Sequence, residues 1–155
     1  MLFDHIGFVV RDLVAGRETL RDGLGVAEWT EAFRDPVNDV IVQFGRASVG
    51  HSHTPADPVA ICYELIMPLS AASPVTAALA RGVNLLNHVA YRVAALATEA
   101  DRLEDAGFLV LGPPKPAVAY GGKPIQFFLS RTRLMIELIE APDHEHPYGA
   151  PELRG

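Results

Sequence analysis

Cysteine is almost absent from this chain of 155 residues, in which Cys62 is the only one. A single thiol cannot form an intramolecular disulfide or a thiolate metal cluster, so nothing in the sequence indicates an oxidising compartment. The N-terminal stretch MLFDHIGFVV also lacks the basic leader of a signal peptide. We therefore expect a cytoplasmic protein.

Positive charge and long apolar runs are scarce as well. The chain has 13 Lys and Arg against 19 Asp and Glu, which gives a formal net charge of -6. Non-specific binding to nucleic acid needs clustered Lys and Arg, so we expect no nucleic-acid partner. No apolar run reaches the roughly 18 residues that a transmembrane helix needs, so we expect no membrane span. The remaining composition, 49% hydrophobic and 21% charged, is typical of a globular domain.

An internal repeat organises the sequence. A shift of 83 residues lays Phe3–Asp22 over Leu86–Asp105 and places His5 on His88. Because two copies are too few for a solenoid, this repeat suggests a fused pair of half-domains that close on each other. Other aligned pairs are Asp4 with Asn87, Val10 with Val93, Leu13 with Leu96, and Asp22 with Asp105.

The ends of the two halves match too. YELIMP at Tyr63–Pro68 resembles IELIEAP at Ile136–Pro142, with Glu64 over Glu137 at a shift of 73 residues. The smaller shift requires extra chain in the first half. We expect it at Arg46–Pro58, a stretch rich in Ser, Gly, His and Pro that is typical of a loop.

The hydrophobic periodicity of each half predicts a strand, a helix and three further strands. Asp12 can cap the first helix, whereas its counterpart Ala95 cannot. The opening strands are expected at Phe3–Val10 and Leu86–Val93. The later strands are expected at Val26–Thr30, Asp39–Arg46 and Val59–Met67, and at Phe108–Leu111, Pro124–Ser130 and Arg133–Ile139.

We therefore expect an α+β protein in which two tandem βαβββ modules form a curved mixed sheet around a central metal cleft. Residues 1–68 are the first module, 69–84 a linker helix, 85–142 the second module and 143–155 a C-terminal tail, all within one compact domain. The tail contains His144 and His146 among Pro and Gly residues, a composition that favours a surface extension.

The four repeated polar residues His5, Glu64, His88 and Glu137 form the candidate site. Alone, each histidine would be an ordinary hydrogen-bonded core residue and each glutamate a residue at a strand edge facing water. Their recurrence in both halves favours one shared site, because a buried carboxylate or imidazole is costly unless it is paired or bound to a metal. Two imidazoles and two carboxylates suit a divalent ion such as Zn, Co, Ni, Mn or Fe.

Other residues are candidates for contacts with a substrate. Arg92 shares its strand face with His88 and could meet an anionic substrate or pair with an internal carboxylate. The turn formed by Gly121, Gly122 and Lys123 could bind a phosphate or carboxylate through backbone N–H groups and the ammonium, or be a bare hairpin turn. The expected loop also carries two histidines that are either solvated or part of a lid over the cleft, His51 and His53.

From FDHIGFVVRDL at residues 3–13 to IELIEAP at 136–142, the sequence resembles the vicinal oxygen chelate superfamily, which includes glyoxalases, extradiol dioxygenases and antibiotic-resistance binding proteins. Within it, ELIMPLSAASPVTAAL, LNHVAYRV and GGKPIQFFL are most similar to methylmalonyl-CoA epimerases. The resemblance implies paired βαβββ modules around a metal. It assigns the ligand positions to His5, Glu64, His88 and Glu137, with Glu137 as the catalytic proton shuttle, and it favours a homodimer.

The expected activity is that of a metal-dependent isomerase or lyase that removes an α-proton from a small acid or acyl thioester. Such epimerases use a second glutamate from the third strand, but NDVIVQFGR at residues 38–46 contains none. Asp39 and Glu31 are the remaining candidates. The alternatives are a glyoxalase-like lyase, an extradiol-type dioxygenase, against which the fourth ligand counts, and a non-catalytic protein that binds or sequesters a small molecule.

Overall fold

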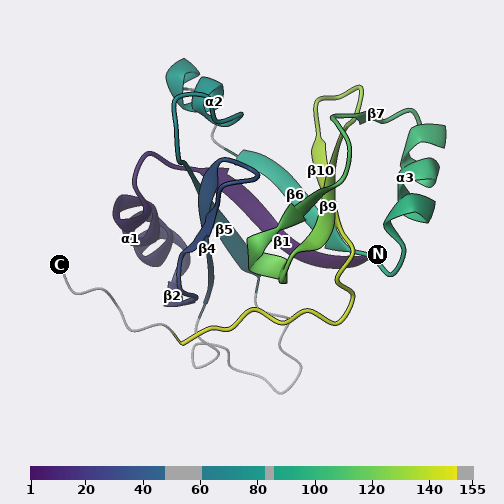
Figure 1. Cartoon of the computed structure of the whole chain (residues 1–155). Coiled ribbons are helices and arrows are strands. Elements are labelled where there is room, and N and C mark those ends of the chain that lie inside the picture. Colours follow the sequence, from purple (N-terminus) through teal and green to yellow (C-terminus); the bar gives the residue numbers. More distant parts are fainter. Residues whose placement is uncertain (48–60, 83–85, 150–155) are drawn as a thin grey trace.

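One curved mixed sheet of ten strands contains both halves of the chain in the computed structural model, which describes residues 1–47, 61–82 and 86–149 (Figure 1). The first half contains β1 (Leu2–Val9), α1 (Leu13–Leu24), β2 (Val26–Trp29), β3 (Phe33–Asp35), β4 (Val40–Ala47) and β5 (Cys62–Pro68). After α2 (Thr76–Arg81), the second half contains β6 (Leu86–Arg92), α3 (Leu96–Asp105), β7 (Leu109–Val110), β8 (Lys115–Ala117), the 3₁₀ turn η2 (Val118–Tyr120), β9 (Lys123–Leu129) and β10 (Met135–Ile139).

The two halves meet at the middle of the sheet. The strand order is β2-β4-β5-β1-β6-β10-β9-β7, with β3 beside β4 and β8 beside β9. β1 pairs with β6 in antiparallel fashion, and each opening strand also pairs in parallel with the closing strand of its own half, β5 or β10. The predicted α+β class and the repeated order of elements are therefore confirmed, and α2 lies within the predicted linker.

Each half also contains a short strand that the sequence did not indicate. β3 and β8 have three residues each, and β8 includes Pro116, a residue that disfavours strand interiors. Such short segments carry too few alternating residues for periodicity to identify them.

The two long helices begin in different ways. The Asp12 carboxylate accepts a hydrogen bond from the Ala15 N–H at 2.9 Å, as predicted for an N-cap. Ala95 gives α3 no side-chain cap. Instead, Glu140, from just after β10, accepts from the Leu96 N–H at 2.7 Å. The residue that follows the closing strand therefore replaces the missing cap and fixes α3 to the sheet.

The outer face of the sheet packs against the helices. Leu20 of α1 packs with Leu65 and Trp29 of the sheet. Leu103 of α3 packs with Leu138 of β10. The inner face has its own core, which surrounds the candidate site and includes Val9, Phe44, Ile66, Ala90, Ile125 and Ile139. None of the helices in the described residues is long and apolar enough to cross a membrane.

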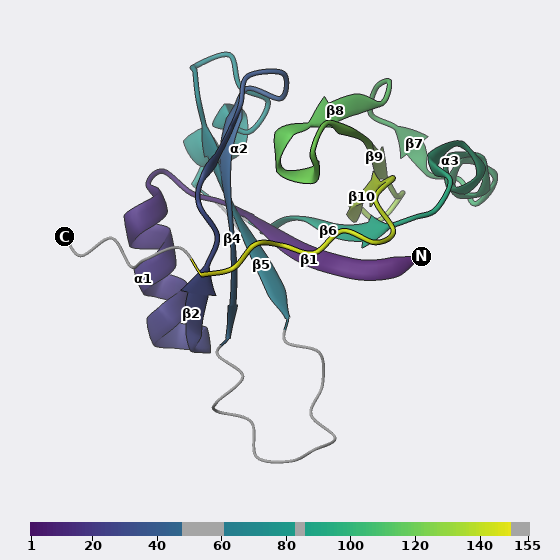
Figure 2. The ribbon, with the colours of Figure 1, turned by 60° about the horizontal axis from the view of Figure 1, so that its bottom comes forward.

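The chain beyond β10 turns back across the sheet. Figure 2 shows this segment passing over β6, β1, β5 and β4 toward β2. Its side chains alternate, with residues 143, 145, 147 and 149 exposed and the residues between them partly covered. The expectation of a surface extension is therefore wrong for residues 143–149. Its composition resembled that of a loop, but the alternation directs one set of side chains onto the sheet.

Candidate metal centre

The structure brings His5, Glu64, His88 and Glu137 together at the seam between the halves, each on a different strand. The two imidazole Nε2 atoms lie 2.9 Å apart. Oε2 of Glu64 lies 3.3 Å from His5 Nε2 and 3.4 Å from His88 Nε2. Oε2 of Glu137 lies 3.4 Å and 3.0 Å from the same two atoms. Glu64 and Glu137 therefore each contact both imidazoles.

Strand register produces this convergence. Gly7 of β1 is opposite both Glu64 of β5 and His88 of β6. In the second half, Ala90, the counterpart of Gly7, is opposite Glu137. A Cβ on Gly7 would lie 2.5 Å from Cε1 of His88, so the glycine creates the space that the imidazole occupies.

Hydrogen bonds orient both imidazoles with Nε2 toward the centre. His5 Nδ1 lies 2.8 Å from Oδ2 of Asp4, and His88 Nδ1 lies 2.9 Å from Oδ1 of Asn87. Because these oxygens only accept, each Nδ1 must carry a proton, and both Nε2 atoms are directed toward the two carboxylates. Hydrogen bonding of the second ring nitrogen in this way is typical of metal-binding histidines.

The site has a deficit of positive charge. All four side chains are buried, and His5 is fully so. Burial alone would lower the pKa of His5, but the carboxylates of Glu64, Asp4 and Glu137 raise it well above its ordinary value. In the absence of a metal, a proton therefore resides there. The donor set meets the requirement of a divalent cation, since two carboxylates balance its charge.

The spacing of three of the donors, His5, His88 and Glu137, fits such an ion. The five distances between imidazole nitrogens and carboxylate oxygens or between the two nitrogens range from 2.9 to 3.4 Å. Ligands bound about 2.1 Å from one cation are separated by about 3.0 Å in an octahedron and about 3.4 Å in a tetrahedron. The ligand atoms of His5, His88 and Glu137 all lie within 4.8 Å of one another, so these three fit the cation as they stand, and Glu64 would complete the set by a movement of its side chain.

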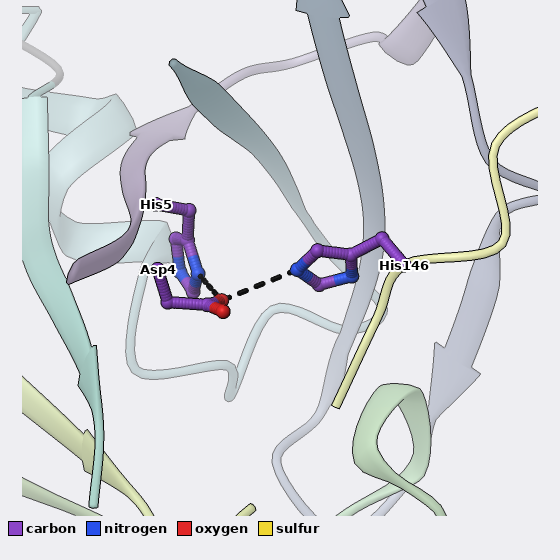
Figure 3. A group of neighbouring side chains, drawn as sticks. All are labelled: Asp4, His5 and His146. Atoms are coloured by element: carbon purple, nitrogen blue, oxygen red, sulfur yellow. Dashed lines mark hydrogen bonds and ion pairs between the residues drawn. The ribbon is translucent and has the colours of Figure 1, made fainter. Parts of the chain in front are cut away.

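Asp4 connects the candidate centre to a wider polar network. Besides His5, its Oδ2 atom accepts a hydrogen bond from the Tyr120 hydroxyl at 2.5 Å and lies 3.2 Å from Nε2 of His146 (Figure 3). Its Oδ1 atom forms an ion pair with Nε of Arg92 at 2.8 Å. Burial alone would raise the pKa of Asp4, but hydrogen bonds and the charges of His146 and His5 hold it well below its ordinary value. Asp4 is therefore an anion at neutral pH.

A cavity of about 420 Å³ opens beside the four donors. Glu64, His88 and Glu137 line it. Its wall is mostly apolar and includes Val40, Val42, Ile66, Val75, Ala117, Ile125 and Phe127, whereas its other polar lining residues are Asp35, Asn38, Asn87, Lys115, Tyr120 and Gln126. This shape and chemistry suit a small substrate with a polar end at the donors.

The residues predicted from the sequence to contact a substrate do not line the cavity. Arg92 pairs with Asp4 and donates to the backbone oxygens of Pro142 and His144, so the internal pairing is the one observed. Gly121, Gly122 and Lys123 are exposed and are not among the residues that line the cavity. Both glycines have positive φ angles, as a tight turn requires.

The cavity includes several polar residues that sequence reasoning missed. Lys115 belongs to the second half and has no polar counterpart that the repeat would reveal, whereas Gln126 is the counterpart of Gln43 at the shift of 83 residues. Asp39 accepts a hydrogen bond from Ser70, and neither it nor Glu31 lines the cavity. His51 and His53, the histidines of the expected lid, lie outside the described residues.

Fold and site together define a class of protein: two fused half-domains, each contributing an imidazole and a carboxylate to a buried cluster beside a small cavity. The chain belongs to the Glyoxalase/Bleomycin resistance protein/Dioxygenase superfamily, whose family model matches residues 4–128. This membership confirms the resemblance derived from the sequence.

Individual relatives agree with that assignment. The ethylmalonyl-CoA/methylmalonyl-CoA epimerase of Cereibacter sphaeroides is 30% identical over 125 residues, which are 80% of this chain and 84% of that protein. A Streptomyces coelicolor methylmalonyl-CoA epimerase variant in complex with 2-nitronate-propionyl-CoA has the same fold, with a TM-score of 0.70, 24% identity, and coverage of 94% of this chain and 97% of that one. A hypothetical protein of Bacillus halodurans matches with a TM-score of 0.72 and 19% identity over 93% and 96% of the two chains.

Proposed function

We propose that this protein is a divalent-cation-dependent epimerase that removes and returns the α-proton of a small acyl thioester. The observation that carries the proposal is the convergence of two imidazole Nε2 atoms and two carboxylates at the wall of the cavity. The epimerase from Cereibacter sphaeroides supports the choice of a branched malonyl thioester as substrate.

His5, Glu64, His88 and Glu137 would hold the cation. When bound, it supplies positive charge beside the substrate oxygens on which negative charge develops as the α-proton leaves. The apolar wall of the cavity would exclude water and strengthen that interaction. Lys115 lies at the same wall, where it could orient the substrate's carboxylate group.

Glu137 is the proposed base. Its contacts with the two imidazoles use Oε2, and within the described residues no hydrogen bond or ion pair engages Oε1. The same holds for Glu64, which reaches the cavity from the opposite half. A two-sided epimerisation needs one proton-transfer group on each face of the substrate. Glu64 is therefore our proposal for the second group.

The inner face of β4 supports this choice. This face of β4 consists of Val40, Val42 and Phe44, which are opposite Pro68, Ile66 and Glu64 on β5. It therefore carries no carboxylate. Gln43 donates to the backbone oxygen of Thr30 and is opposite Leu65, on the outer face. Asp35 lines the cavity, but both of its carboxylate oxygens accept hydrogen bonds, from Val37, Asn38 and Val118.

A test follows hydrogen exchange in deuterated water. Chelator-treated protein is reloaded with Zn, Co, Ni, Mn or Fe, and deuterium incorporation at the α-carbon of (R)- and (S)-methylmalonyl-CoA and ethylmalonyl-CoA is measured by mass spectrometry. We expect exchange only with metal. The single variants Glu64→Gln and Glu137→Gln should each lose exchange mainly with one enantiomer, and with opposite ones. The double variant that carries both substitutions should lose exchange with both enantiomers. Absence of exchange by fully loaded protein with any of these thioesters would overturn the proposal.

The apolar face of β4 also favours a second candidate, a glyoxalase-like lyase in which one base moves a proton between neighbouring carbons. Product analysis separates the two activities. Conversion of a hemithioacetal to a 2-hydroxy thioester, without interconversion of acyl-CoA enantiomers, would identify the lyase.

A further inference from the structure

The segment of residues 143–149 after β10, here called the C-terminal strap, is fixed to both halves of the sheet. At its start, Arg92 donates to the backbone oxygens of Pro142 and His144. At its end, the Gly149 N–H donates to the Trp29 oxygen at 3.1 Å, and the Tyr148 hydroxyl donates to Sγ of Cys62 at 2.9 Å. The strap thus has a defined path from the second half to the first.

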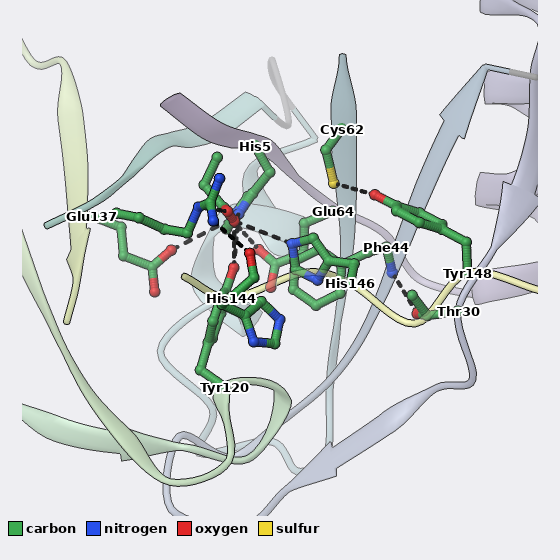
Figure 4. A network of polar contacts seen from close by, with 12 residues as sticks. His5, Thr30, Phe44, Cys62, Glu64, Tyr120, Glu137, His144, His146 and Tyr148 are labelled. Atoms are coloured by element: carbon green, nitrogen blue, oxygen red, sulfur yellow. Dashed lines mark hydrogen bonds and ion pairs between the residues drawn. The ribbon is translucent and has the colours of Figure 1, made fainter. Parts of the chain in front are cut away.

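His146 lies at the middle of that path, beside Asp4 and the candidate centre. Its side chain is 7% exposed, and its ring stacks on Phe44 with the ring centres 4.0 Å apart. Phe44 in turn contacts the ring of His5 edge-on at 5.2 Å. Figure 4 shows His146 directed from the strap toward the group around His5.

The polar contact of His146 has a defined direction. Nε2 lies 3.2 Å from Oδ2 of Asp4, a carboxylate oxygen that can only accept, so Nε2 must carry the proton. Nδ1 is buried and has no hydrogen-bond partner in the described part of the chain. A buried nitrogen without a partner is costly, and the ring is held in place in spite of that cost.

The two histidines of the candidate centre differ in their support. His88 relies on the neutral amide of Asn87, whereas His5 relies on the charged Asp4, which receives further contacts from Tyr120, Arg92 and the strap. We propose that His146 is a positioning residue that holds Asp4, and through it the His5 imidazole, in the orientation that binds the cation. The inference rests on the proposed function, because it takes the four donors as the cation site.

Two substitutions separate the hydrogen bond from the packing. His146→Phe keeps a ring on Phe44 but removes the N–H donor, whereas His146→Gln keeps a donor at a similar reach and removes the ring. Glu145→Gln, on the exposed side of the strap, is the matched control. Cobalt(II) affinity is measured by chelator competition, together with the visible absorption spectrum of the bound ion.

We expect His146→Phe to weaken cobalt binding by up to about tenfold, the lower end of the loss for a direct hydrogen-bond partner of a metal-binding histidine, because His146 acts on His5 through Asp4. Its spectrum should change, His146→Gln should retain most of the affinity, and Glu145→Gln should match the wild type. Should His146→Phe fail to fold, His146→Asn, whose amide is one carbon too short, takes its place and should show the same loss relative to His146→Gln.

The outcomes distinguish the two proposals. Wild-type cobalt affinity in His146→Phe, or equal weakening in the Phe and Gln variants, overturns the positioning role. The ring of His146 would then contribute only packing. Wild-type protein that binds no cobalt overturns the proposed function, and the positioning role with it.

Discussion

Gly7 and His88 stand in van der Waals contact across the seam between β1 and β6, so close that any side chain at residue 7 would overlap the imidazole. The two residues are opposite each other in the antiparallel pair, and an added Cβ would lie 2.5 to 2.8 Å from three ring atoms. The absence of one side chain therefore determines where a candidate ligand lies.

Gly7→Ala should displace His88 and weaken cobalt(II) binding at least tenfold. The overlap should also lower the free energy of unfolding by about 1–3 kcal/mol, as overpacking of a dense core does. Urea unfolding of the metal-free protein and chelator competition measure the two effects. Gly23→Ala is the matched control, since a Cβ there has nothing within 4 Å and lies inside α1, where alanine should stabilise by about 0.5–1 kcal/mol. Equal cobalt affinity in both variants would contradict the prediction.

Stability of the metal-free protein should fall in acid because of Glu137. Burial alone would raise the pKa of Glu137, but His88 and His5 beside it lower it to about 2 from an ordinary 4.5. A carboxylate with a lowered pKa stabilises the fold above its ordinary pKa and loses that contribution as the pH falls toward the folded value.

The measurement compares thermal unfolding of chelator-treated wild type and Glu137→Gln between pH 2 and 7. The stability difference between them should be constant above pH 4.5 or so and shrink as the pH falls toward about 2. A difference that does not change with pH across that interval would show that the Glu137 carboxylate is not stabilised in the fold.

Cys62 should react slowly with thiol reagents. Its side chain is buried, and burial raises the pKa of the thiol to about 11 in spite of the hydrogen bond from Tyr148. The thiolate is the reactive species, so little of it exists at pH 8. Reaction with Ellman's reagent should be far slower in native protein than in protein unfolded with guanidinium, and comparable rates in the two states would disprove this protection.

The caps of the two long helices should contribute similar stability by different means. Asp12→Ala and Glu140→Ala each remove the acceptor for a helix N–H group and should each cost about 1 kcal/mol in urea unfolding. Asp12→Asn, which keeps an acceptor, should cost much less. An effect of Glu140→Ala near zero would mean that water replaces Glu140 at the start of α3.

The fold class and the grouping of His5, Glu64, His88 and Glu137 could be predicted because the order of elements and the pair of His and Glu both occur in each half. Duplication converts a weak local pattern into a constraint on space: equivalent residues of two like halves lie at equivalent places around the seam.

The support around these residues could not be predicted in the same way. Parity places Asp4 and His5 on opposite faces, yet both are buried and bonded to each other, because the β1–β6 register is irregular between Phe3 and Ile6. Sequence gives no sign of that irregularity. The strap was missed because its Pro and Gly residues suggested a loop, although the alternation of His144, His146 and Tyr148 was a signal of a covered, extended segment.

The seam between β1 and β6 has a thermodynamic consequence for the whole chain. Each half supplies one imidazole and one carboxylate, so neither half alone can form the four-donor cluster. An ion that binds only the assembled cluster would couple its own concentration to the folding equilibrium, adding about 2.7 kcal/mol when present at a hundred times its dissociation constant. The metal concentration would then shift the fraction of molecules in which the two halves are packed together. A chelator that removes the ion would lower the free energy of unfolding by the same amount.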